Sequence, residues 1–401
     1  MKILYLAHRI PYPPDKGDKI RAYHEIKFFA GRHSVDVCCL MDDTEDKKFI
    51  APLSKICRNL EVVYIPARLK KLLSLRSVFY PRKTCTELYF YSRKLQDKIN
   101  NLIKKNSYDL IFVYCSSMMA YVDNHIKSIP AVIDFVDIDS DKWLQYAKYA
   151  SLPLNMLYSL EGRKLARLER SILRKVKASF LVTERESEFF AEFEGGDRVF
   201  AVPNGIDFSF FNADKVASVR ELEKERYISF TGAMDYFPNE DGVLYFCQNI
   251  LPLIWRKIPD LKFYIIGRNP TVAVEKLADD KRIVVTGSVD DVRPYLKHSQ
   301  LAAIPLRMAR GIQNKILEAM AMGLPVVTTS NAFEGLALDP GRDLIVHDQP
   351  HKFADAVVEL LSDTQAREEL VDNARKVLVE KYDWSRNLTI MHDILVESGK
   401  A

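Results

Sequence analysis

The stretch that decides the fold is LAAIPLRMARGIQNKILEAMAMGLPVVTTS, residues 301–330. An apolar strand is predicted to end at Pro305, and a helix is predicted to begin near Gln313 after a loop that carries Arg307. A glycine ends the helical pattern, and Pro325 introduces a second strand. This order of strand, loop, helix and strand is typical of a parallel α/β sheet.

The loop and the start of this helix predict an anion-binding site. A helix N-terminus presents unpaired N–H groups and a partial positive charge, and Arg307, Arg310 and Lys315 are cations close to it in sequence. Glu318 lies too far along the helix for ordinary capping, and its carboxylate is placed to accept hydrogen bonds from a diol such as a ribose. In the alternative interpretation, Lys315 and Glu318 form a solvated i, i+3 pair on a core-packed helix.

The segment EAMAMGLPVV, from Glu318 onward, resembles the donor-nucleotide signature of retaining glycosyltransferases with the GT-B fold, family four. The resemblance implies that Lys315 and Arg307 contact the diphosphate of a nucleotide sugar and that Glu318 contacts its ribose. Arg310, Gly311, Ile312, Gln313 and Asn314, in the loop and at the helix start, are further candidates for donor contacts. The family has a glutamate where this chain has Arg310, and the variant RGIQNK resembles a subgroup associated with exopolysaccharide and exosortase (PEP-CTERM) systems.

Composition places the chain among soluble globular proteins. Its 401 residues suffice for two domains, 48% of them are hydrophobic, and a net charge of +4 is too small to indicate nucleic-acid binding. No apolar run reaches the roughly 18–20 residues of a membrane span, and the N-terminal residues predict a buried strand rather than a signal peptide. The six cysteines are scattered without a C-x-x-C pair, which favours reduced thiols in a cytoplasmic protein over a disulfide or zinc framework.

Strands and helices alternate through both halves of the chain. The alternation predicts an α/β fold with two doubly wound, Rossmann-like parallel sheets, which the resemblance identifies as GT-B domains facing across a cleft. A Pro-Asn-Gly turn follows residue 202, and we expect an acceptor-binding domain at 1–200, a donor-binding domain at 201–382 and a returning helix at 383–401. The predicted strands are 2–7, 35–41, 60–66, 109–114, 131–136 and 178–182 in the first half, and 198–203, 227–232, 262–267, 282–287, 301–306, 325–329 and 344–347 in the second. The predicted helices lie near 19–31, 45–58, 86–105, 117–126, 155–177, 240–256, 291–297, 313–322, 351–361 and 364–381.

Three strands of the second half end in glycine, at Gly232, Gly267 and Gly287. Glycines at the carboxyl ends of parallel strands favour a ligand cleft at that edge of the sheet. The resemblance makes Gly232 a donor contact, and Arg268 is a further candidate. No GxGxxG follows the first strand of either half, so we expect no nicotinamide or flavin cofactor. The expected co-substrate is a nucleotide sugar, with a UDP-sugar favoured over a GDP-sugar.

Two segments of the first half supply the remaining candidates. HRIPYPPDKGDKIR, residues 8–21, resembles the family's glycine loop through Gly17, and the alternative is a proline-rich turn capped by Asp18. VIDFVDIDSDKW, residues 132–143, places Asp137 as the catalytic candidate near the reacting sugar carbon or the acceptor hydroxyl, with Val136 where the family often has histidine. Its aspartates also fit an aspartyl phosphatase or the metal clamp of GT-A transferases, but those alternatives leave the second half unexplained, and no metal site is expected.

The segment ARLKKLLSLRSVFYPRK, residues 67–83, mixes six cations with Leu, Val, Phe and Tyr. It fits either contact with an anionic membrane or an ordinary surface loop, whereas residues 161–177 predict a core-packed helix with a solvated basic side. The resulting hypothesis is a metal-independent, retaining hexosyltransferase that uses a glycan or lipid-linked acceptor in bacterial exopolysaccharide synthesis, in the cytoplasm or peripheral at the inner face of its membrane. The alternatives are a nucleotide-sugar epimerase on the same fold and a non-catalytic donor-binding subunit.

Overall fold

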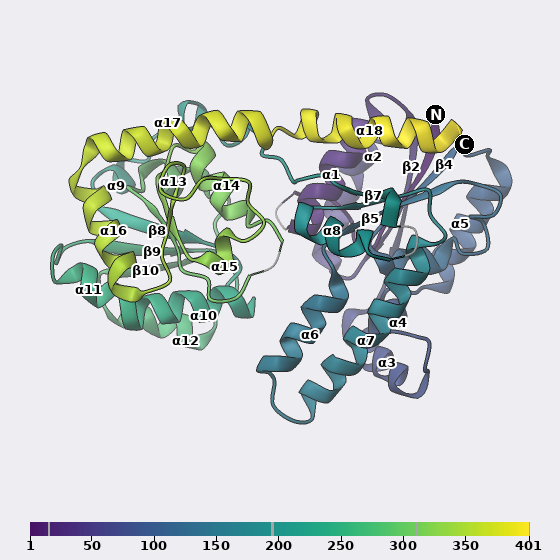
Figure 1. Cartoon of the computed structure of the whole chain (residues 1–401), viewed down its shortest axis with the longest axis horizontal. Coiled ribbons are helices and arrows are strands. Elements are labelled where there is room, and N and C mark those ends of the chain that lie inside the picture. Colours follow the sequence, from purple (N-terminus) through teal and green to yellow (C-terminus); the bar gives the residue numbers. More distant parts are fainter. Residues whose placement is uncertain (15–16, 194–195, 310, 401) are drawn as a thin grey trace. The chain divides into compact units, whose positions relative to one another are not determined.

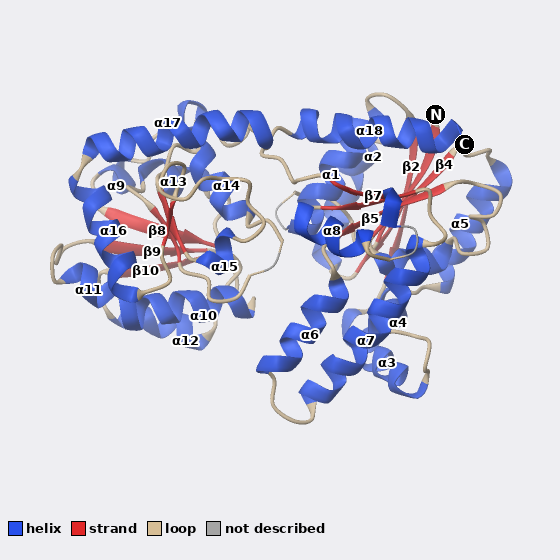
Figure 2. Cartoon of the chain, viewed as in Figure 1, coloured by secondary structure: helices blue, strands red, loops and turns tan. Residues whose placement is uncertain are grey.

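The computed structural model describes residues 1–14, 17–193, 196–309 and 311–400. The chain divides into two compact units (Figures 1 and 2). Unit 1 comprises Met1–Val202 together with Ser385–Ala401, and unit 2 is Pro203–Trp384. Each unit is a parallel β-sheet with helices on its faces, which confirms the predicted α/β class.

Unit 1 contains a seven-stranded sheet in the order β3-β2-β1-β4-β5-β6-β7, in which neighbouring strands are parallel. Its strands are β1 (Lys2–Ala7), β2 (Ser34–Met41), β3 (Asn59–Tyr64), β4 (Leu110–Tyr114), β5 (Ala131–Val136), β6 (Ala178–Leu181) and β7 (Val199–Ala201). Its helices are α1 (Gly17–Ala30), α2 (Ile50–Ser54), α3 (Ala67–Ser74), α4 (Cys85–Phe90), α5 (Arg93–Lys105), α6 (Asp139–Tyr149), α7 (Leu154–Leu173), α8 (Glu184–Ala191) and α18 (Trp384–Lys400). Short 3₁₀ helices are η1 (Thr44–Phe49), η2 (Leu75–Phe79), η3 (Ser116–Tyr121) and η4 (Gly196–Arg198).

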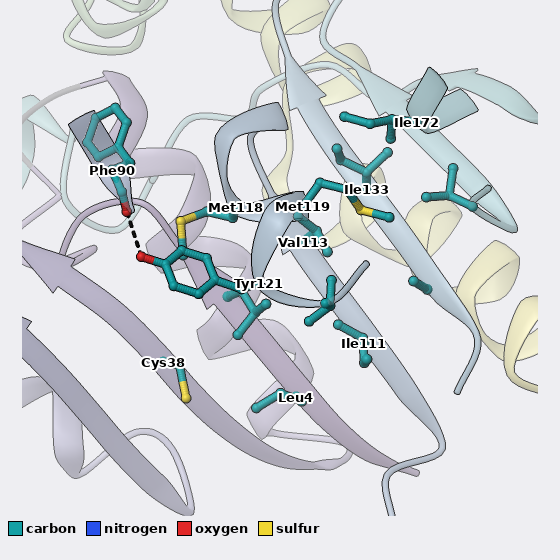
Figure 3. Packing of buried hydrophobic residues seen from close by; sticks show 14 of the residues in the cluster. Leu4, Cys38, Phe90, Ile111, Val113, Met118, Met119, Tyr121, Ile133 and Ile172 are labelled. Atoms are coloured by element: carbon teal, nitrogen blue, oxygen red, sulfur yellow. Dashed lines mark hydrogen bonds between the residues drawn. The ribbon is translucent and has the colours of Figure 1, made fainter. Parts of the chain in front are cut away.

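The central strands of unit 1 are buried on both faces, as a sheet covered by helices on each side requires. Alternate residues of a strand face opposite sides, so Leu4 and Leu6 join one core while Tyr5 stacks on Phe112 on the other side, with ring centroids 4.8 Å apart. The first core also receives residues of α5, η3 and α7, several of which are drawn in Figure 3.

Three predicted helices of unit 1 differ from the structure. The one expected at 45–58 is the 3₁₀ helix η1 followed by the short α2. The pattern over 86–105 is broken into α4 and α5, because the hydroxyl of Tyr121 binds the backbone at the break: it donates to Phe90 O at 2.6 Å (Figure 3) and accepts from Ser92 N at 2.6 Å. The helix expected at 117–126 is only the 3₁₀ turn η3. Conversely, the aspartate-rich segment 139–149 forms α6, which was not predicted.

Unit 2 contains a six-stranded sheet in the order β10-β9-β8-β11-β12-β13. Its strands are β8 (Tyr227–Thr231), β9 (Lys262–Ile266), β10 (Ile283–Gly287), β11 (Ala302–Ile304), β12 (Val326–Thr328) and β13 (Ile345–Val346). Its helices are α9 (Arg220–Glu223), α10 (Phe237–Tyr245), α11 (Leu251–Trp255), α12 (Val272–Glu275), α13 (Arg293–His298), α14 (Asn314–Ala321), α15 (Ser330–Phe333), α16 (Pro350–Ser362) and α17 (Thr364–Lys381), with a π-helical turn η6 (Phe246–Ile250) and 3₁₀ turns η5 (Ala213–Lys215) and η7 (Lys276–Asp279). In Figure 1, α10 and α12 lie on one side of this sheet and α13, α14 and α17 on the other.

One strand was assigned to the wrong half. The strand predicted at 198–203 is β7, and it pairs with β6 of unit 1 through the register Ser179↔Val199 instead of opening the second sheet. The reason is its position: the Pro-Asn-Gly turn that leads into unit 2 begins only after Val202, so the chain completes the first sheet before it leaves.

Within the described ranges, no helix combines the length and the apolar character needed to cross a membrane.

Candidate functional site

The best candidate site of unit 2 lies at the carboxyl edge of its sheet. In the strand order, β8 lies beside β11. From β8 the chain continues to β9 on one side of this pair, and from β11 it continues to β12 on the other side. Open α/β sheets bind ligands at such a switch point. After β8 the chain passes through Gly232 into α10, and after β11 it passes through the loop with Arg307 into α14. The predicted loop and helix therefore stand where this type of sheet binds ligands.

Lys315, in the first turn of α14, reaches back to the end of β8. Its Nζ donates to Asn239 Oδ1 of α10 at 2.5 Å and lies 4.2 Å from the centre of the Phe230 ring. Asn239 is held in turn by a bond from its Nδ2 to Ala233 O at 2.9 Å. A Cβ on Gly232 would lie 2.6 Å from Asn239 Nδ2 and 3.0 Å from Lys315 Nζ, so only glycine fits against this ammonium group.

Glu318 and Lys315 differ from the solvated surface pair of the alternative interpretation. Both are only partly exposed. Burial lowers the pKa of Lys315 to about 7, opposed by the charge of Glu318, and burial raises the pKa of Glu318 to about 7, opposed by the charge of Lys315. Two neighbouring titratable groups whose pKa values are shifted this far from their usual values are typical of a functional site.

Gly267 permits an unusually close contact between two strand ends. A Cβ there would lie 1.7 Å from the carbonyl oxygen of Gly232, and the φ angle of Gly267 is +154°. The next residue, Arg268, contributes its carbonyl to this edge by accepting from Met234 N at 2.9 Å. The structure thus places Arg268 beside the predicted site, with its side chain half-exposed.

Arg307 forms an ion pair with a carboxylate of its own unit. Its Nε donates to Asp241 Oδ2 of α10 at 2.9 Å, its Nη2 pairs with the other oxygen of Asp241, and its guanidinium lies 4.6 Å from the centre of the Tyr245 ring. The side chain of Arg307 remains 50% exposed. Arg307 therefore lies at the predicted edge, but a phosphate would have to share it with Asp241 or displace that carboxylate.

The start of α14 is held by the segment that opens unit 2. Asn314 Oδ1 accepts from Asn204 Nδ2 at 3.2 Å, and Asn204 belongs to the Pro-Asn-Gly turn. Gln313 caps α14 without a side-chain capping bond, and its Nε2 donates instead to Gly311 O at 3.4 Å. Gly311 has a φ of +62°, and Ile312 is buried. Arg310 lies outside the described residues.

In unit 1, the carboxyl end of β5 is organised by buried charges. Arg21 of α1 is fully buried, pairs through Nε with Asp134 of β5, and donates from Nη1 to Val202 O at 2.8 Å. Asp134 in turn accepts from Val136 N at 3.0 Å, where the backbone turns with a φ of +69°. A β-branched residue at positive φ is a strained conformation, and the Asp134 carboxylate stabilises it.

Asp137 follows directly after this strained residue. It is partly exposed, and burial raises its pKa, opposed by Lys142 and reinforced by the negative charge of Asp139. Asp139 begins α6, whose first turn is capped by the buried Glu169 through Ser140 N at 2.9 Å. Among the described residues, no three His, Cys, Asp or Glu side chains form a group that could hold a metal ion.

Gly17 begins α1 and is exposed, and a Cβ there would meet nothing within 4 Å. The fold itself does not require glycine at this position. Residues 15–16 of the same predicted loop lie outside the described residues.

Sequence reasoning missed the partners of the predicted cations. Asn239 and Asp241 follow β8 in GAMDYFPNEDG, a segment that had suggested no site residue beyond Gly232. The available signal was their place: both lie in the first two turns of the helix that follows β8. In unit 1 the signal was Asp134 inside the apolar strand AVIDFV, because a buried carboxylate requires a partner such as Arg21.

Comparison with known proteins bears on the same region. Residues 225–363 match the family model described as glycosyl transferases group 1. An uncharacterized 44.6 kDa protein in the cps region of Klebsiella pneumoniae is 20% identical over 396 residues, 95% of this chain and 96% of that protein. Alpha-D-kanosaminyltransferase from Streptomyces kanamyceticus is 27% identical over 286 residues, 66% of this chain and 70% of the transferase.

Among solved structures, Anabaena Alr3699/HepE in complex with UDP and glucose is similar over 99% of this chain and 100% of its own. The TM-score is 0.67 at 14% sequence identity, so this similarity concerns the fold. The predicted fold class is confirmed: the chain has the GT-B fold, and its residues 225–363 are similar to the group 1 glycosyl transferases.

Proposed function

We propose that the protein transfers a hexose from a UDP-sugar to a glycan or lipid-linked acceptor, with retention at the anomeric carbon and without a metal ion. The observation that carries this proposal is the ammonium group of Lys315, held at the end of β8 by Asn239 and lying against Gly232. A cation on the first turn of a helix, at the switch point of a parallel sheet, is suited to a diphosphate.

The chemistry requires stabilisation of a leaving group. Breaking the bond between C1 of the sugar and the diphosphate oxygen leaves growing negative charge on the diphosphate, and groups already oriented toward that charge lower the barrier. One cation about 4 Å from a phosphate charge contributes about 4 kcal/mol at an effective dielectric near 20, before desolvation is subtracted. Lys315 and Arg307 are assigned this role, with N–H groups of Gly311 and Ile312 as further donors.

The environment of Lys315 suits this task. In the absence of an anion its pKa lies at about 7 because of burial, and a neighbouring diphosphate favours the protonated form. Asn239 accepts from the ammonium group without neutralising it. Glu318, one turn further along α14, is assigned to the ribose hydroxyls, and Gly232, Arg268, Arg310, Gln313 and Asn314 complete the proposed donor site.

Asp137 is the proposed catalytic residue of unit 1. Burial raises the pKa of Asp137, and the residue follows the turn at Val136, at the edge of the sheet where the strands end. Both observations support the proposed role. We assign Gly17 to the same edge as a backbone contact for donor or acceptor.

The biological setting is part of the proposal. The Anabaena structure holds UDP and glucose, and the Streptomyces relative is named for transfer of a sugar, which supports a UDP-hexose donor. The Klebsiella relative is named for a cps region, which supports a role in bacterial polysaccharide synthesis. We also propose that the protein belongs to the exosortase-associated subgroup, on the basis of the RGIQNK variant. Segment 67–83 supports a cytoplasmic location with contact to the inner face of the membrane.

The test is turnover of UDP-glucose with and without glycan acceptors, in the presence of EDTA. We expect release of UDP only with acceptor and full activity in EDTA. Activity lost in EDTA and restored by manganese would contradict metal independence. A product equal in mass to the donor would indicate an epimerase, and donor binding without turnover on every acceptor would indicate a non-catalytic subunit.

The donor site itself is tested by Lys315→Ala and Glu318→Ala. We expect each to weaken UDP-glucose binding by about tenfold or more, since each removes a charge-assisted hydrogen bond. Isothermal titration calorimetry measures the affinity, and unchanged affinity in both variants would refute the site.

A further inference from the structure

The segment after β3 exposes an unusual set of apolar side chains. In α3, Leu72 is 66% exposed, and in η2, Phe79 is 83% exposed. Further apolar residues of the same segment are at least 44% exposed, namely Leu69, Leu75, Val78 and Tyr80. Single exposed apolar residues are ordinary, but a group of them along one short segment marks an interaction surface.

A second group lies at the turn between α6 and α7. Leu152 is 71% exposed, Tyr149 68% and Met156 67%, and Leu154 is also exposed. In Figure 1, this turn and α3 both extend away from the seven-stranded sheet of unit 1, on the side where α6 and α7 project. The two groups therefore belong to one projecting part of the unit.

The charge of both segments is uniformly positive. Residues 67–83 contain six Lys and Arg and no Asp or Glu. Residues 142–160 contain two lysines and likewise no acidic residue. Of the first group, Arg68, Lys71, Arg76 and Arg82 are exposed, whereas Lys70 is partly exposed and donates to Tyr91 O. A surface that combines bulky apolar side chains with cations and no anion complements an anionic lipid bilayer.

Two buried, charged side chains of α7 bind the backbone of this segment and of the residues that follow it. Lys164 Nζ donates to the carbonyls of Ser77 at 2.6 Å and Tyr80 at 2.9 Å. Glu161 accepts from the backbone N–H groups of Cys85 at 2.7 Å and Thr86 at 2.9 Å. Both α7 side chains are buried. These backbone groups are thus bonded to α7, while the side chains of Phe79 and its apolar neighbours remain exposed.

We propose that α3, η2 and the α6–α7 turn form a docking surface for an anionic lipid bilayer. Leu72, Phe79, Leu152 and Met156 enter the boundary between headgroups and acyl chains, and the exposed cations bind lipid headgroups. The sequence had left residues 67–83 open between membrane contact and surface loop. The α6–α7 turn as a second contact follows from the structure alone. This surface is independent of the donor chemistry proposed above.

The test is sedimentation of the full-length protein with vesicles, in the absence of any nucleotide. We expect binding to vesicles of phosphatidylcholine with about one third phosphatidylglycerol, and little binding to pure phosphatidylcholine. Binding should weaken at high salt but not vanish, because apolar insertion is not screened. Equal binding to both vesicle types, or none to either, would overturn the proposal.

Paired variants locate the surface. Leu72→Glu with Phe79→Glu, and Leu152→Glu with Met156→Glu, should each reduce vesicle affinity more than tenfold. Arg76→Gln should reduce it about fivefold, as expected for the loss of one cation near an anionic surface. The matched control is Val272→Glu with Val379→Glu, which alters two equally exposed apolar residues of unit 2 and should leave vesicle binding unchanged.

Two measurements separate this proposal from its rivals. Circular dichroism and UDP-glucose affinity should match the wild type in all variants, so loss of vesicle binding with intact donor binding supports the docking surface independently of the enzymatic function. Size-exclusion chromatography tests a second copy of this chain as the occupant. A dimer that the Leu72→Glu/Phe79→Glu variant dissociates, without vesicle binding by the wild type, would overturn the lipid assignment.

Discussion

At the scale of single residues, Lys315 determines how the proposed site should respond to pH. Its pKa of about 7 means that it is protonated below neutrality and loses its charge as the pH rises. The diphosphate of a UDP-sugar stays ionised over this range, so loss of the Lys315 charge should weaken binding as the pH rises above 7. Above it we expect a fall of at most about tenfold per pH unit.

Lys315→Arg provides the control, because arginine remains charged throughout this range. Binding of UDP-glucose, measured by calorimetry from pH 6 to pH 9, should no longer fall above pH 7 in that variant. A wild-type affinity that stays constant, or rises with pH, would show that Lys315 does not meet the diphosphate.

Arg307 and Asp241 supply a second prediction at this scale. Because Asp241 already pairs with Arg307, removing the carboxylate charge should free the guanidinium for a phosphate. Asp241→Asn should then tighten UDP-glucose binding by up to about fivefold, the most expected of a partly exposed ion pair. Arg307→Ala should weaken binding about tenfold or more.

The same titration series measures both variants at constant ionic strength. Weaker binding in Asp241→Asn would mean that the carboxylate holds Arg307 in its binding position, and the assignment of Asp241 as a competitor would then be wrong.

The sequence allowed Lys315 and Glu318 to be singled out because helical spacing fixes their place relative to a helix start. It did not reveal which groups they meet. Asn239 comes to Lys315 from 76 positions away, and Arg21 reaches Asp134 across 113 positions. Such contacts depend on the order of strands in the sheet, which local patterns do not specify.

At the scale of elements, the carboxyl ends of β8 and β9 lie in closer contact than any side chain would allow. A Cβ on Gly267 would lie 1.7 Å from Gly232 O. We therefore expect Gly267→Ala to lower the free energy of unfolding by about 3 kcal/mol or more. Displacement of Gly232 should also weaken UDP-glucose binding.

Gly287→Ala is the matched control at the end of the neighbouring strand. Its φ is +67°, but a Cβ there meets nothing within 4 Å. Only the left-handed backbone is then penalised, by about 1–2 kcal/mol. Urea unfolding of both variants measures the difference, and equal destabilisation would contradict the steric account.

The strands of both sheets could be predicted because buried parallel strands are continuous apolar runs. Helix boundaries were harder where a tertiary contact overrides the local pattern. The hydroxyl of Tyr121 ends α4, and the buried Glu169 of α7 caps α6 from outside the predicted segment. Neither contact can be found by reading residues 86–105 or 139–149 alone.

At the scale of the whole molecule, the last helix completes the first unit. Although α18 follows unit 2 in the chain, Leu388, Met391 and Leu395 are buried, and residues from Ser385 onward belong to unit 1. We expect Met391→Ala to destabilise unit 1 by about 2–5 kcal/mol, as for other buried methionines. Donor affinity should change little, because this account places most of the donor contacts in unit 2.

Ile390→Ala is the control, since Ile390 is 47% exposed on the same helix, and its effect should stay within about 0.5 kcal/mol. Thermal unfolding with and without UDP-glucose measures both properties. Loss of donor binding in folded Met391→Ala protein would contradict the assignment of the main donor contacts to unit 2.

The GT-B architecture could be read from the sequence because strand and helix patterns repeat in both halves and the 301–330 segment has a specific signature. The strand at 198–203 was grouped with the second half, because β7 carries no local mark of the sheet it joins. The roles of Asp137 and Gly17 remain predictions, since each role depends on where the substrate binds.

The most direct test of the central claim is a crystal structure with UDP-glucose bound. The account predicts diphosphate oxygens within hydrogen-bond distance of Lys315 Nζ and of the backbone N–H groups at the start of α14, with the ribose at Glu318. Phosphorus atoms located away from residues 307–318 would contradict it.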